Sequence, residues 1–193
     1  MALHLANDPL GQIIQCRRAL RPDGLFLAVL PGGRTLSELR AAISQAEVEH
    51  SGGLSPRVAP MAEIRDLGGL LQRAGLALPV ADSTLHRVSY GSMHDLMRDL
   101  RSMGETNPMA GRSKNFTAAD LMRRAARIYA ENFTGSDGRL EASFELIYLA
   151  GWAPDASQPR PLRPGSAAAR LAEALETTEY DENARPVPGN SKS

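Results

Sequence analysis

Residues 20–29 read LRPDGLFLAV, and this stretch combines the end of a helix, a tight turn and the start of an apolar strand. Pro22 lacks a backbone N–H and Gly24 tolerates unusual backbone angles, so the chain is expected to turn here. Leu25 to Leu30 contains no polar residue. Such a run is typical of a strand that is covered on both faces, as in parallel sheets. The stretch therefore predicts a buried strand early in the chain.

A helix is expected on each side of this strand. Asp8 can accept hydrogen bonds from the free amides of a first turn, and Pro9 suits the first helical position. Residues 35–38 read TLSE, a capping-box pattern that predicts a second helix over residues 36–49.

A third helix and a second strand follow. Periodic apolar residues predict a helix over residues 61–74, and residues 76–90 read as extended. Pro79 lies inside the extended segment and cannot donate a ladder hydrogen bond, which indicates an edge strand.

Two more helices and a third strand complete the predicted fold. Weaker capping boxes at residues 92–95 and 117–120 predict a helix pair within about residues 91–134. Residues 142–152 are almost entirely apolar and aromatic, which predicts a largely buried strand. Strands separated by helices indicate the α/β class.

The charge and cysteine content exclude several classes of protein. The 22 basic and 22 acidic residues give a formal net charge of zero, so no long-range field favours nucleic acid or an anionic membrane. Cys16 is the one cysteine, which rules out an intrachain disulfide and fits a reducing compartment. No secretory signal and no membrane-length apolar run is present. We therefore expect a cytoplasmic protein without nucleic-acid partners or membrane spans.

The composition changes near residue 154, where prolines become frequent. We expect residues 1–153 to form one domain. Residues 154–193 are expected to form a proline-rich tail with a short helix near residues 167–175 and a disordered end.

Several segments, in this order, resemble the C-terminal half of class I S-adenosylmethionine-dependent methyltransferases. Residues 3–8 (LHLAND) are similar to the family's L-H-W-V-N-D segment after its fourth strand, and residues 20–25 to the turn before its fifth. YGSM at residues 90–93, DLRSMGETN at 99–107 and FELIYLAGW at 144–152 are similar to segments of one branch. That branch contains BioC-type carrier-protein methyltransferases and relatives of mitochondrial complex I assembly factor 5.

The resemblance implies a Rossmann-like methyltransferase sheet of strand order 3-2-1-4-5-7-6, with the seventh strand antiparallel. We expect this chain to hold strands five, seven and six, with the helix pair of residues 91–134 as a lid. An intact family member would transfer a methyl group from S-adenosylmethionine to a protein or a carrier-bound acyl substrate. Whether this branch methylates or hydroxylates here is left open.

The expected cofactor-binding segments have no counterpart in the sequence. The family holds the cofactor with a glycine-rich turn after its first strand, where backbone amides approach the ligand closely. Gly32 and Gly33 follow the fifth strand instead, and Leu5 replaces the family's tryptophan. We therefore expect a truncated domain that does not bind S-adenosylmethionine tightly alone. A truncated gene, a misplaced start and a split enzyme all remain open, and so does activity of the isolated chain.

The resemblance also implies a set of site residues. His4 and Asn7 correspond to a remnant of the cofactor-binding loop. No catalytic residue is predicted, and the scattered histidines lack the spacing of metal ligands. The expected substrate-binding residues are Tyr90, Arg101, Glu105, Asn107 and Tyr148.

A second hypothesis is a non-catalytic assembly or binding module. If strand five has lost its neighbour, Leu25 to Leu30 presents unpaired backbone groups that recruit another chain. The partner is expected to be a second copy of this chain or the missing N-terminal half.

Overall fold

The computed structural model describes residues 3–159, 177, 178, 180 and 185. The chain divides into a unit Met1–Ala156 and a second unit Ser157–Ser193, and the elements below all belong to the first unit. The predicted short helix near residues 167–175 and the predicted disordered end lie outside the described residues, apart from a few isolated positions.

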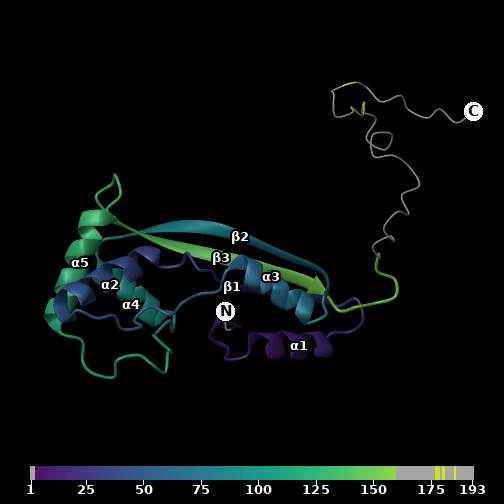
Figure 1. The fold of residues 1–193 in the computed structure, drawn as a ribbon, viewed down its shortest axis with the longest axis horizontal. Helices are drawn as coiled ribbons and strands as arrows, with labels where there is room; N and C mark the ends of the chain where they lie inside the picture. Colours follow the sequence, from purple (N-terminus) through teal and green to yellow (C-terminus); the bar gives the residue numbers. More distant parts are fainter. Residues whose placement is uncertain (1–2, 160–176, 179, 181–184, 186–193) are drawn as a thin grey trace, which may run out of the picture. The chain divides into compact units, whose positions relative to one another are not determined.

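Helices and strands follow one another in the order that the sequence predicts (Figure 1). The elements are η1 (Leu3–Leu5), α1 (Pro9–Ala19), β1 (Leu25–Pro31), α2 (Ser37–Ser51), α3 (Ile64–Arg73), β2 (Ala77–Tyr90), α4 (Met93–Ser102), α5 (Ala119–Asn132) and β3 (Leu140–Trp152). The strands form a sheet of order β1-β3-β2 in which β3 runs antiparallel to both neighbours. This confirms the α/β class and the expected adjacency of strands five, seven and six.

Three local predictions are confirmed by the hydrogen bonds. The Asp8 side chain accepts from the amide of Gly11 at 2.8 Å at the start of α1. The Ser92 hydroxyl accepts from the amide of Asp95 at 3.2 Å at the start of α4. Pro79 lies in β2, which is an edge strand of the described sheet, at a shift of the pairing register.

The capping box predicted at residues 35–38 is wrong. Leu36 precedes α2 with φ 56°, and no side chain caps the helix. The Thr35 hydroxyl instead exchanges hydrogen bonds with the backbone of Glu145, at 3.1 Å in both directions. Glu38 accepts from the amide and hydroxyl of Ser143. Both side chains bond backbone groups of β3 at Ser143 and Glu145, beyond the point where the pairing with β1 ends. These buried backbone groups need hydrogen-bond partners, and bonding them takes the place of capping the helix.

The box predicted at residues 117–120 is also wrong. Ala118 precedes α5, which has no side-chain cap. The Thr117 hydroxyl instead accepts from the Arg57 guanidinium at 2.7 Å. A charged donor from another loop has replaced the helix amide as its partner.

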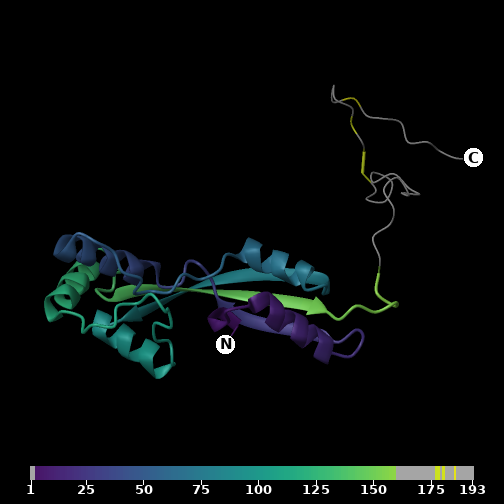
Figure 2. The same ribbon diagram turned by 60° about the horizontal axis from the view of Figure 1, so that its bottom comes forward.

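Two hydrophobic clusters lie at opposite ends of the long β2–β3 ribbon (Figures 1 and 2). At one end α2, α4 and α5 pack with Leu140 and Ala142 of β3. At the other end α1 and α3 pack with Ile147 and Leu149 of β3 and with β1. Because alternate residues of a strand face opposite sides, the two clusters use opposite faces of β3.

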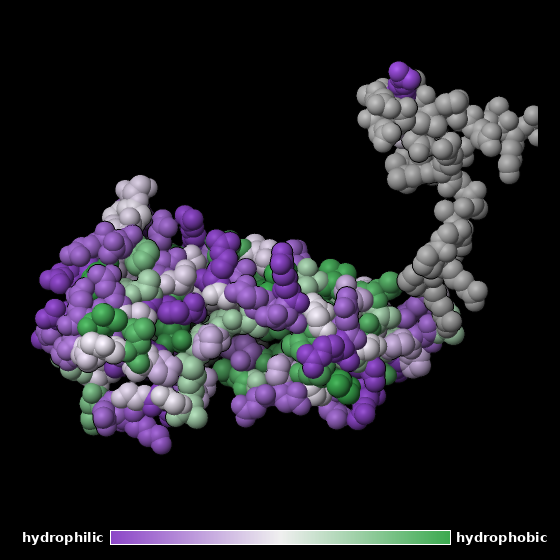
Figure 3. Space-filling model, viewed as in Figure 1, coloured by the Kyte–Doolittle hydropathy of each residue, from purple (hydrophilic) through white to green (hydrophobic). Residues whose placement is uncertain are grey.

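The expectation that Leu25 to Leu30 is covered on both faces is wrong. Phe26 and Leu30 are buried in the cluster with α1 and α3, whereas Leu27 is 68% exposed and Leu25 is 44% exposed. The described helices at this end cover one face of the sheet only. Figure 3, seen from the side on which α3 lies in front of the sheet, shows hydrophobic residues interspersed with hydrophilic ones over β1, α1 and α3.

Candidate functional site

A cavity of about 390 Å³ lies where the end of β1, the start of α2 and the loop after α4 meet. Most of its wall is apolar. This part of the wall includes Leu36, Leu39, Val58, Leu100, Phe144 and Leu146. The polar part of the wall comes from His4, Thr35, Arg57, Glu105, Thr106 and Asn107. An apolar hollow with a few converging polar groups is the usual form of a small-ligand site.

The most specific contact in this wall joins His4 and Glu105. Nε2 of His4 lies 3.2 Å from Oε2 of Glu105, although the two residues are 101 positions apart. The His4 side chain is only 4% exposed, whereas the Glu105 side chain is 32% exposed. Because the Glu105 carboxylate accepts, the Nε2 atom carries the hydrogen. Nδ1 of His4 is buried and has no hydrogen-bond partner within the described part of the chain.

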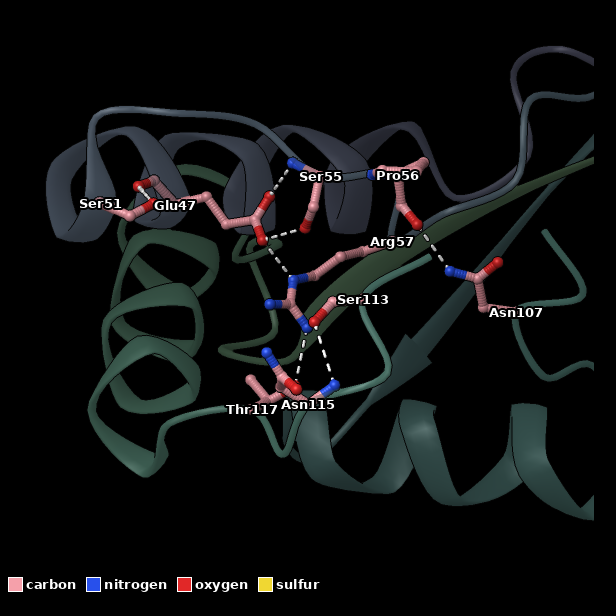
Figure 4. A network of polar contacts seen from close by, with 9 residues as sticks. All are labelled: Glu47, Ser51, Ser55, Pro56, Arg57, Asn107, Ser113, Asn115 and Thr117. Atoms are coloured by element: carbon pink, nitrogen blue, oxygen red, sulfur yellow. Dashed lines mark hydrogen bonds and ion pairs between the residues drawn. The ribbon is translucent and has the colours of Figure 1, made fainter. Parts of the chain in front are cut away.

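A polar network fixes the loop that forms another part of the wall (Figure 4). Glu47 of α2 is buried and accepts from the amide of Ser55 at 2.9 Å and from the Arg57 guanidinium at 2.5 Å. Burial opposes the charge of Glu47, but hydrogen bonds from Ser55 and Arg57 outweigh it and lower the pKa of the carboxyl group. The pair is thus held in its ionised form at neutral pH.

The same network reaches the segment between α4 and α5. Arg57 donates to the Thr117 hydroxyl at 2.7 Å. The side-chain amide of Asn107 donates from Nδ2 to the backbone carbonyl of Pro56 at 2.7 Å (Figure 4). Together with the His4–Glu105 contact, these bonds anchor the α4–α5 segment beside the cavity at three points.

The structure brings some of the predicted site residues together and separates others. His4, Glu105 and Asn107 line the cavity, and Arg101 lines a second cavity next to it. Asn7 is exposed and lines neither cavity.

The two predicted tyrosines lie elsewhere. Tyr90 packs against the cluster of α2, α4 and α5, and burial together with the charge of Asp99 raises the pKa of its hydroxyl. Tyr148 is 41% exposed on the open face of the sheet. Neither ring lines the cavity that holds His4 and Glu105.

Sequence reasoning missed Glu47 and Arg57. Residues 51–60 read only as a loop rich in glycine, serine and proline, and Glu47 read as one of several charged helix residues. No local pattern pairs an acidic residue with an arginine ten positions away across a helix end.

The Gly32–Gly33 turn does not fit the cofactor that the family would hold at a glycine-rich turn. A side chain added at Gly32 would collide with the Glu145 carboxylate, and one at Gly33 with the Glu63 carboxylate. Oε2 of Glu145 already accepts from the amide of Arg34 at 3.0 Å. The space beside these glycines is filled by the chain's own carboxylates, which would also repel the carboxylate of an amino-acid ligand.

Within the described residues, no group of three or more histidine, cysteine or acidic side chains could hold a metal ion. No helix in the described part of the chain combines the length and apolar composition needed to cross a membrane.

Comparison with known proteins confirms the resemblance found in the sequence. The chain is 39% identical over 173 residues to the mitochondrial arginine-hydroxylase NDUFAF5 of Danio rerio, covering 90% of this chain and 54% of that protein. The human NDUFAF5 is also 39% identical, with 90% and 50% covered. A malonyl-[acyl-carrier protein] O-methyltransferase of Xylella fastidiosa is 36% identical over 138 residues, covering 72% of this chain and 44% of the relative.

The chain is thus similar over most of its own length to NDUFAF5 and to the malonyl-[acyl-carrier protein] O-methyltransferases. It spans about half the length of the curated relatives it matches. No protein-family model matches the chain. The NDUFAF5 relatives are named as mitochondrial, so the expected cytoplasmic location stays a prediction.

A solved structure of a putative methyltransferase from Bacillus halodurans is also similar. Its TM-score is 0.47 at 15% identity, with 80% of this chain and 67% of that chain covered.

Proposed function

We propose that this chain forms the substrate-binding part of a methyltransferase-type enzyme that modifies a group on a protein. The observation that carries this proposal is the apolar cavity into which the His4–Glu105 pair is built. The chain is further proposed not to hold S-adenosylmethionine tightly by itself, because its glycine turn is filled by Glu145 and Glu63.

The charges around the cavity favour a cationic target such as an arginine side chain. Arg57 is occupied by Glu47 and Thr117 and is not free to pair with a ligand carboxylate. Glu105 keeps about a third of its side chain exposed, and among the described residues its carboxylate contacts only His4. A carboxylate binds a guanidinium with two parallel hydrogen bonds, while the apolar wall suits the aliphatic part of arginine. The names of the NDUFAF5 relatives agree with this target.

Methyl transfer to a carrier-bound acyl group is the second candidate. The malonyl-[acyl-carrier protein] O-methyltransferases among the relatives favour it. A malonyl carboxylate in the first cavity would need a free cation there, and Arg57, the one arginine or lysine among the described lining residues of that cavity, already pairs with Glu47. The wall charges therefore rank this candidate below the arginine side chain.

Two titrations test the proposal. Calorimetry should give no micromolar binding of S-adenosylmethionine to the purified chain, and micromolar binding would contradict the absence of a cofactor cradle. A short peptide with one arginine should bind more tightly than the same peptide with citrulline, because citrulline keeps the shape but loses the charge. Glu105→Gln should abolish this preference, whereas the exposed α5 variant Glu131→Gln should keep it.

A partner is proposed to cover β1 and the open face of the sheet. Leu25, Leu27 and Val80 are exposed there. A cavity of about 390 Å³ follows β1 beside α1. Within the described residues β1 pairs with β3 alone. Apolar edge strands of this kind associate with further strands.

The partner favoured by the length of the relatives is polypeptide equivalent to the half of NDUFAF5 that this chain does not match. A homodimer through Leu25 to Leu30, or an assembly module without catalysis, would use the same surface. Light scattering tests this surface. The proposal would be contradicted if the chain stayed monomeric at high concentration and did not bind a polypeptide equal to the unmatched half of the zebrafish relative.

A further inference from the structure

A second cavity of about 310 Å³ adjoins the first one, and its charges differ from those of the first. The two cavities share part of their walls, including Arg57, Leu100, Glu105 and Asn107. The second cavity extends further along the α4–α5 segment, where Arg101, Arg112, Ser113 and Thr117 line it.

Two of the three arginines in this wall lack an acidic partner. Arg57 is neutralised by the buried Glu47, and Glu105 is directed to His4. The Arg101 side chain forms no hydrogen bond or ion pair among the described residues, and the Arg112 guanidinium donates only to the carbonyl of Met109, at 3.0 Å. Two guanidinium groups with unused donors therefore border one hollow.

The hydroxyl groups in the wall add further donors. The Thr117 hydroxyl accepts from Arg57 at 2.7 Å, and the Ser113 hydroxyl accepts from the amide of Asn115 at 3.3 Å. Each oxygen is thus engaged as an acceptor, which leaves its O–H free to donate. The lining combines positive charge with hydroxyl donors, and this is the chemistry that binds oxyanions.

We propose that this second cavity is an oxyanion site that selects substrates with an anionic group close to the modified residue. The inference rests on the proposed function: the first cavity takes the cationic target side chain, and the second takes an acidic neighbour on the same peptide. The anionic group is an aspartate or glutamate carboxylate or a phosphate ester, which share this recognition chemistry. Arg101 and Arg112 are the specificity-determining residues.

The oxyanion site is tested first without any peptide. Inorganic phosphate is titrated into the full chain at constant ionic strength, and the amide resonances of residues 101–117 are followed by NMR. Saturable shifts are expected. Arg101→Gln and Arg112→Gln should each weaken phosphate binding by about three- to tenfold, since each removes a charge-assisted hydrogen-bond donor at a partly exposed site. Arg98→Gln is the matched control, because Arg98 pairs with Asp95 on the same helix and lines neither cavity.

Peptides then identify the source of the anion. Arginine peptides carry glutamate, phosphoserine or glutamine at positions one to four residues away from the arginine. Tighter binding of the glutamate or the phosphoserine peptide, lost in Arg101→Gln, supports the site and names the group.

The outcomes separate this inference from the proposed function. Phosphate binding that responds to Arg101 and Arg112 supports the oxyanion site even if no arginine peptide binds, and that result would count against the proposed function alone. No saturable phosphate binding, or equal binding in wild type and both arginine variants, overturns the oxyanion site. Glutamine peptides that bind as tightly as the anionic ones overturn its role in selection.

Discussion

The two ends of the β2–β3 ribbon differ in how completely their apolar residues are covered and in how firmly their loops are held. At the end that carries α2, α4 and α5, the residues of the hydrophobic cluster are enclosed, and Glu47, Arg57 and Thr117 anchor the loops. At the end that carries β1, helices α1 and α3 enclose one face, while Leu27 and Val80 stay exposed on the other. The first end thus holds its loops in place beside the cavity, whereas the second leaves an apolar face exposed.

This difference bears on how the chain is used. A cavity keeps its shape only if its walls are held, and three long-range contacts hold the α4–α5 segment. An apolar face and an open strand edge, by contrast, lower their free energy when something covers them. Our proposals therefore assign substrate binding and assembly to different ends of the same sheet.

The largest expected effect compares two leucines on opposite faces of neighbouring strands. Leu149 is 1% exposed and packs with the α1–α3 cluster, whereas Leu27 is 68% exposed. Leu149→Ala should lower the free energy of unfolding by about 2–5 kcal/mol because it leaves a cavity. Leu27→Ala should change it by less than about 0.5 kcal/mol. Urea denaturation measures both, and equal losses would show that both faces are covered in solution.

A smaller loss is expected when the network beside the cavity is broken. Glu47→Gln leaves the Arg57 guanidinium without its charged partner, so the free energy of unfolding should fall by about 1–3 kcal/mol. The matched control is Glu49→Gln on the same helix, whose side chain is 38% exposed. A loss for Glu49→Gln as large as that for Glu47→Gln would argue against a special role of the buried pair.

The same carboxyl group predicts a pH dependence. Its pKa in the folded chain lies below the ordinary value of 4.5, so the folded state binds this proton less readily than the unfolded chain. Its stabilisation is therefore complete above about pH 4.5 and is lost as the pH falls through the folded-state pKa. Denaturation curves between neutral pH and pH 3 should show a shallower loss of stability in Glu47→Gln than in wild type. Parallel curves would contradict this assignment.

A local effect is expected at the His4–Glu105 contact. Glu105→Gln should weaken the anchoring of the loop after α4, so amides of residues 103–109 should exchange about two- to tenfold faster with deuterium. The global free energy of unfolding should change little. Unchanged exchange in this segment would show that the other two anchors suffice.

The smallest change in stability, but a clear change in association, is expected at the open face. Leu27→Lys places a charge on the edge strand and should reduce self-association or partner binding without unfolding the chain. The radius measured by light scattering should become independent of concentration. Phe26→Lys is the contrasting variant, because Phe26 is 9% exposed in the α1–α3 cluster and a charge there should destabilise the fold. Association that Leu27→Lys leaves intact would place the interface elsewhere.

The sequence by itself determined the order of the elements and several of their ends. Asp8 and Ser92 cap helices as predicted, because a side chain that bonds an amide two or three residues away acts within one turn. Pro79 marked the edge strand for a similarly local reason, since its ring removes one backbone donor. Resemblance in named segments also indicated His4, Glu105 and Asn107, which do line one cavity.

Tertiary structure decided which face of each strand is covered and what each polar side chain bonds. Thr35, Glu38 and Thr117 were predicted to cap helices. In the fold they instead bond β3 or Arg57, which are hydrogen-bond partners from distant parts of the chain. Leu27 is as apolar as Leu30, yet one is exposed and the other buried, because burial depends on whether a helix lies above the strand. The spacing of residues along the chain does not indicate which distant residues become neighbours. The Glu47–Arg57 pair and the open face of the sheet could therefore be identified only from the folded structure.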